Sequence, residues 1–154
     1  MGNGTRDRTH DHKRAVAKTS APDRSQTSFV DFEVLADQLN ATIEEIEDAL
    51  SQRYQINIPV RIPLSVDVGG DTRVGALAWK KMGTPMMSIC VEFTQPKTGV
   101  FQDERVSHAP SHWRCAAVKA LPQLMSAIDD EHAAAHERMH DAVQAAAAFL
   151  ESLR

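Results

Sequence analysis

The sequence predicts an α+β fold made of an N-terminal helical pair, a three-stranded antiparallel β-meander and a long C-terminal helix. Apolar residues recur at helical spacing between residues 31 and 53, and they alternate strictly with polar ones over residues 55–68. After Pro122 no helix breaker interrupts the chain as far as Leu153. We therefore expect a single α+β domain over residues 29–154, behind a disordered basic arm of residues 1–28.

The arm carries six basic and three acidic residues, a net charge of +3 that leaves −7 on the rest of a chain whose total is −4. Apart from Met1 its only sizeable apolar side chain is Val16, so burial cannot offset the entropy of ordering it. One hypothesis is that its basic residues contact nucleic acid; the alternative is a solvated tail. The candidate contacts are Arg6, Arg8, Lys13 and Arg14.

Residues 31–53 are predicted to form two short helices, because Thr42 and Glu45 have the spacing of a capping box just after Asn40-Ala41. This spacing resembles a helix-turn-helix, which implies a DNA-reading second helix. That helix, however, presents four carboxylates, which phosphates repel. We prefer an acidic helix face that binds a partner protein. Its residues are Glu44, Glu45, Glu47 and Asp48.

The strand over residues 55–68 is predicted to lie at a sheet edge, because Pro59 and Pro63 remove two backbone donors from the same side. Gly69-Gly70-Asp71 and Met82–Pro85 are turn sequences, which places further strands at residues 73–81 and 86–94. Trp79 and Phe93 are expected to anchor the core. Residues 95–110 have the character of a long loop.

The C-terminal helix is expected to start after Ser111 and to be opened or kinked at Pro122. Its apolar stripe is longer than a three-stranded sheet can cover, so its distal part is a candidate homodimer interface, parallel or antiparallel. The stripe contains Leu121, Leu124, Ile128, Ala135, Met139, Ala146, Leu150 and Leu153.

The same helix carries His136-Glu137-Arg138-Met139-His140, an H-E-x-x-H pattern. The five residues resemble the zinc site of zincin metallopeptidases, which implies His136 and His140 as zinc ligands and Glu137 as the catalytic base. No third ligand follows on the straight helix, so it would come from Asp103, Glu104, His108 or His112. A cluster of His132, His136 and His140 that responds to pH across a dimer is a further alternative.

Composition excludes other classes. Cys90 and Cys115 form no C-x-x-C pair and are expected to be reduced and buried, and no apolar run approaches the length of a membrane span. We expect a cytoplasmic protein without a cofactor. Its expected function is that of a non-enzymatic interaction or accessory module whose partner is another protein or a second copy. A zinc-dependent hydrolase and a nucleic-acid-binding protein are the alternatives.

Overall fold

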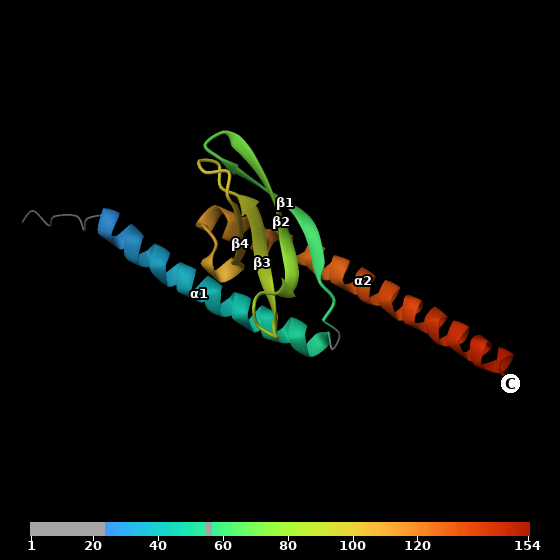
Figure 1. The fold of residues 1–154 in the computed structure, drawn as a ribbon. Helices are drawn as coiled ribbons and strands as arrows, with labels where there is room; N and C mark the ends of the chain where they lie inside the picture. The colour runs from blue at the N-terminus through green and yellow to red at the C-terminus, as the bar shows by residue number, and fades with distance from the viewer. Residues whose placement is uncertain (1–23, 55–56) are drawn as a thin grey trace, which may run out of the picture. The chain divides into compact units, whose positions relative to one another are not determined.

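The computed structural model is α+β, as predicted (Figure 1). It describes residues 24–54 and 57–154, with side chains from residue 31. The elements are α1 (Arg24–Arg53), β1 (Val60–Val68), β2 (Asp71–Lys81), β3 (Met87–Thr94), β4 (Phe101–Arg105), the 3-10 helix η1 (Val106–His108) and α2 (Ser111–Ser152). The described part of the chain divides into two units between Leu35 and Ala36, and the sheet lies in the second.

The sheet is antiparallel with the strand order β1-β2-β3-β4, so β1 is an edge strand, as its prolines predicted. Leu77 in the middle of β2 pairs with Ile62 on one side and with Val91 on the other. Residues in register share a face of the sheet, and this row belongs to the hydrophobic core or packs against it. Trp79 and Phe93 are buried, which confirms them as core residues.

The expectation of a long loop at residues 95–110 is wrong, because this segment contains a fourth strand. A tight turn brings the chain back, with the Gly99 N–H donating to the Gln95 carbonyl at 2.8 Å and Gly99 at a φ of +66°. β4 then pairs with β3, from Phe101 opposite Thr94 to Arg105 opposite Cys90. A short connection containing glycine between two extended runs is typical of a hairpin, and this signal was present in the sequence.

The predicted helical pair is a single helix, α1, which continues through Asn40-Ala41 without a break. The helix-turn-helix interpretation is therefore wrong. Thr42 does not cap a second helix; its hydroxyl donates to the Gln38 carbonyl at 2.9 Å, a bond made inside a continuing helix. Leu39 before the predicted break packs against the same core as Ile43 after it, and a continuous helix keeps both on one side of α1, so this packing outweighs the local capping signal.

Helix α2 packs its first half on the sheet through the buried residues Trp113, Ala117, Ala120, Leu124 and Ile128. Trp113 stacks on Phe93 with the ring centroids 5.2 Å apart. Gly75 makes room for it, because a Cβ there would lie 2.9 Å from the Trp113 ring. Pro122 lies inside the helix on its exposed side and does not end it. This packing fixes the direction in which the second half of α2 leaves the sheet.

Candidate functional site

The distal segment of α2, His136–Arg154, extends past the sheet (Figure 1), and all of its side chains are exposed. Five of these side chains are large and apolar, with exposed fractions between 52% and 69%. They are Met139, Val143, Phe149, Leu150 and Leu153. Isolated exposed apolar residues are common, but a stripe of them along one helix indicates a binding surface.

Most of the charged residues of this part of α2 lie away from the apolar stripe. Arg138 forms an ion pair of 2.6 Å with Glu131, two turns earlier, and Arg154 forms one of 3.1 Å with Glu151. These bonds satisfy charges on the outer side and stabilise the helix modestly. They leave the apolar stripe uncovered.

The boundary between the covered and exposed parts of α2 is a polar cluster that ties it to the end of α1. The Tyr54 hydroxyl donates to the Asp129 carboxylate, which also pairs with Arg53 at 3.4 Å. The Tyr54 ring lies 4.7 Å from the ring of His132, which is half-buried here. Burial, together with the bond to Asp129, raises the pKa of Tyr54, so the hydroxyl stays protonated and keeps donating. No local pattern in the sequence indicates this cluster, because Tyr54 and Asp129 are 75 residues apart.

The H-E-x-x-H residues His136, Glu137 and His140 all lie on the exposed distal segment. In the part of the chain that the structure describes, no group of three or more His, Cys, Asp or Glu side chains is placed to hold a metal ion. Of the proposed third ligands, Asp103 is bound to Lys80 on the sheet, and His112 is about 36 Å from His136 along the helix. Within the described ranges, His136 and His140 are therefore not joined by a third ligand.

The acidic face of α1 is smaller than predicted, because Glu47 is buried while Glu44, Glu45 and Asp48 are exposed. Glu47 accepts the Ile89 backbone N–H at 2.7 Å and forms an ion pair with Arg105. The last residue of β3 that pairs with β4 is Cys90, so the backbone N–H of Ile89 has no partner on β4. The Glu47 carboxylate accepts this N–H instead. Glu47 therefore holds α1 on the sheet and is not available to a partner.

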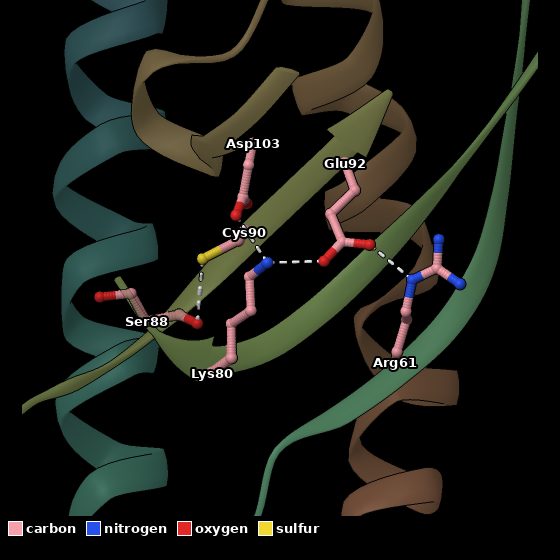
Figure 2. A network of polar contacts seen from close by, with 6 residues as sticks. All are labelled: Arg61, Lys80, Ser88, Cys90, Glu92 and Asp103. Atoms are coloured by element: carbon pink, nitrogen blue, oxygen red, sulfur yellow. Dashed lines mark hydrogen bonds and ion pairs between the residues drawn. The ribbon is translucent and has the colours of Figure 1, made fainter. Parts of the chain in front are cut away.

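Figure 2 shows a charged network on the sheet, with α2 behind it. Glu92 on β3 bonds to Arg61 at 2.5 Å and to Lys80 at 2.6 Å, and Lys80 also bonds to Asp103 at 2.7 Å. Burial opposes the charged form of Glu92, but the bonds to Lys80 and Arg61 outweigh it and lower the pKa of this carboxyl. The period-two pattern placed Arg61 and Glu92 on the polar faces of their strands, but it predicted neither their pairing nor the part of Asp103, which fell in the expected loop.

The two cysteines differ in exposure. Cys90 lies under this network, where burial raises the pKa of its thiol to about 12, and its Sγ–H donates to the Ser88 carbonyl (Figure 2). A protonated, buried thiol is not a nucleophile. Cys115 is exposed, so the expectation that both are buried is wrong for this residue. The network therefore stabilises the sheet and contains no reactive thiol.

Comparison with known proteins assigns no family, since no family model, curated protein or solved structure matches the chain. The arm residues Arg6, Arg8, Lys13 and Arg14 lie outside the described residues, and their contact with nucleic acid stays a prediction. No helix in the described ranges combines the length and apolar character that crossing a bilayer requires. The distal segment is thus the best-defined candidate site.

Proposed function

We propose that this chain is a non-enzymatic interaction module that binds through the distal segment of α2, and that its partner there is a second copy of the chain. One observation carries the proposal: a long helix leaves its own domain with a continuous apolar stripe exposed. Exposing such a stripe to water is unfavourable, and a second helix bearing the same stripe is the simplest way to cover it.

The spacing of the exposed residues supports a helical partner. Alternating steps of three and four residues give a seam, defined here as His136, Met139, Val143, Ala146, Leu150 and Leu153. Such steps keep one line of side chains facing a second helix over several turns. The positions beside the seam are mostly alanines, among them Ala135, Ala142 and Ala147, which allow two helices to approach closely.

Charge is distributed in a way that suits the same interface. Glu137, Arg138, Asp141 and Glu151 all fall on the side of the helix away from the seam. The seam itself contains no residue of fixed charge, so pairing two copies would leave no fixed charge buried without a partner. Acidic and basic residues can stay in water while the apolar side is covered.

The size of the stripe indicates a weak or transient dimer. Each large apolar side chain that is fully covered removes about 60 to 120 Å² from water, by the usual conversion of transfer energies to area. The four large apolar side chains of each seam, with Phe149 beside it and the alanines between them, give on the order of 1,000 Å² in total, the lower limit of specific interfaces. We expect dissociation in the micromolar range.

Sedimentation velocity over a concentration series of the full-length chain tests this proposal. The natural sequence should shift from monomer to dimer as the concentration rises, and Val143→Glu should remain a monomer. The matched control is Gln144→Glu, which adds the same charge one residue away on the outer side. Equal association of the two variants, or a monomer at every concentration of the natural sequence, would contradict the proposal.

A further inference from the structure

We infer that the second copy packs antiparallel on the distal segment, so that each seam begins opposite the end of the other. This inference rests on the proposed self-association and specifies its geometry. It follows from the direction of the seam relative to the sheet, from the pairing of the seam residues and from the charges beside them.

The seam points in the same direction as the side of α2 that the sheet covers. On a helical wheel of 100° per residue, Met139 lies about 20° and Leu150 about 40° from Ile128, which is fully buried against the sheet. The body of each copy therefore lies on the seam side of its own helix. A parallel pair in register would bring both bodies to the same level on that side, where they would collide.

An antiparallel pair avoids this collision because the two bodies lie at opposite ends of the paired helices. The distal segment, His136–Arg154, is long enough for the helix of the second copy to lie beside it. The body of the first copy begins one turn before His136, where His132 contacts Tyr54. The exposed segment thus ends where a second helix would meet the body.

The seam also pairs completely in this direction. If His136 of one copy faces Leu153 of the second copy, then Met139 faces Leu150, and Val143 faces Ala146. The same three pairs are repeated by the two-fold axis, as an isologous interface requires. Each layer then holds two different side chains, and Val143 faces the smaller Ala146, which suits interdigitation better than identical residues facing each other.

The charges beside the seam favour the same direction. In the antiparallel pair, Arg154 of the second copy comes level with Ala135, far along the axis from Arg154 of the first copy. In a parallel pair, Arg154 would stand beside its own counterpart. The helix dipoles also oppose each other in an antiparallel pair. These effects are small, but all have the same sign.

Disulfide trapping in the full-length chain distinguishes the two directions. Met139→Cys and Leu150→Cys are each made in a Cys115→Ser background, because Cys115 is exposed; buried Cys90 can remain. In the antiparallel pair, two copies of Met139 are separated by eleven residues, about 16 Å along the axis, which a disulfide cannot span. The two variants should therefore cross-link only when they are mixed.

The control pair, Gln144→Cys mixed with Ala145→Cys on the outer side, should give no cross-link. Cross-linking of each seam variant alone, with no gain on mixing, would overturn the antiparallel direction in favour of a parallel one. Dimers in sedimentation without any trapped species would also overturn it, and would leave self-association intact. A monomeric natural sequence would instead reject the proposed function and this inference with it.

Discussion

The two halves of α2 share one apolar periodicity but differ completely in environment. Leu124 and Ile128 in the first half are fully buried by the sheet, whereas Met139 and Leu150, on the same side of the helix, are more than half exposed. Their sequence patterns do not distinguish them. The difference comes from the sheet, which covers the helix only as far as the Tyr54 and Asp129 cluster.

An amphipathic pattern therefore predicts a buried face but not what buries it. In the first half the cover comes from the same chain, so the pattern stabilises the fold. In the second half no described residue supplies a cover, so the same pattern stabilises the protein only if another molecule binds. Substitutions in the two halves should therefore change different measurable quantities.

The largest effect is expected for Leu124→Ala, which removes a fully buried side chain from the core. It should lower the free energy of unfolding by about 3 to 5 kcal/mol, through lost burial and the cavity left behind. Urea unfolding followed by tryptophan fluorescence would measure this. Leu150→Ala is the matched change in the distal half, and at a concentration where the chain is monomeric it should shift the unfolding midpoint very little. Equal destabilisation by both would mean that the distal half is packed on its own domain.

Substitutions of polar residues should also differ in their effect on stability between buried and exposed positions. Glu47→Ala should lower the free energy of unfolding by about 2 to 4 kcal/mol, because it leaves the Ile89 N–H and the Arg105 guanidinium without their partner. Glu137→Ala in the distal half and Glu44→Ala on the exposed side of α1 should each change it by less than about 0.5 kcal/mol. Thermal unfolding followed by circular dichroism would rank the three. A Glu47 variant as stable as the controls would show that α1 does not depend on this contact.

A smaller effect, with a distinct pH dependence, is expected for Glu92→Gln. The folded protein lowers the pKa of Glu92 below its ordinary 4.5, so the ionised group stabilises the fold fully above that pH. At neutral pH the variant should lose about 1 to 2 kcal/mol. The difference from the natural sequence should shrink as the pH falls below 4.5 and Glu92 is protonated. A constant difference from pH 7 to pH 3 would contradict the assigned role of the ion pairs with Lys80 and Arg61.

Much of the fold was predictable because its main signals are local. Strict alternation identified β1 and β3, the prolines at positions 59 and 63 identified the sheet edge, and the absence of breakers identified α2. β4 was missed because it is short, Phe101–Arg105, and mostly polar, so it has no apolar face of its own. The break in α1 was wrongly predicted because the capping pattern is local, whereas the apolar stripe around it continues along the whole helix and determines how the helix packs.

The candidate site was predicted only in part. The distal segment could be predicted, because the sequence indicates a C-terminal helix that is longer than the sheet can cover. The burial of Glu47 could not be predicted, because it depends on where β4 ends relative to β3, which is a contact between segments far apart in the chain. The H-E-x-x-H residues lie on a helix, as predicted, but the pattern does not reveal whether a third ligand lies near them, because that depends on contacts between segments far apart in the chain.

The smallest effect is expected on the outer side of the distal half, where the exposed Arg138 pairs with the partly exposed Glu131. Arg138→Ala should change the free energy of unfolding by less than about 0.5 kcal/mol, because exposed ion pairs contribute little. It should also leave self-association unchanged, whereas Val143→Glu on the seam abolishes it. Sedimentation velocity on Arg138→Ala measures this directly. If the loss of Arg138 weakened the dimer as strongly as a seam substitution, the interface would lie on the charged side of α2, and the contrast between the two sides of the distal segment would be reversed.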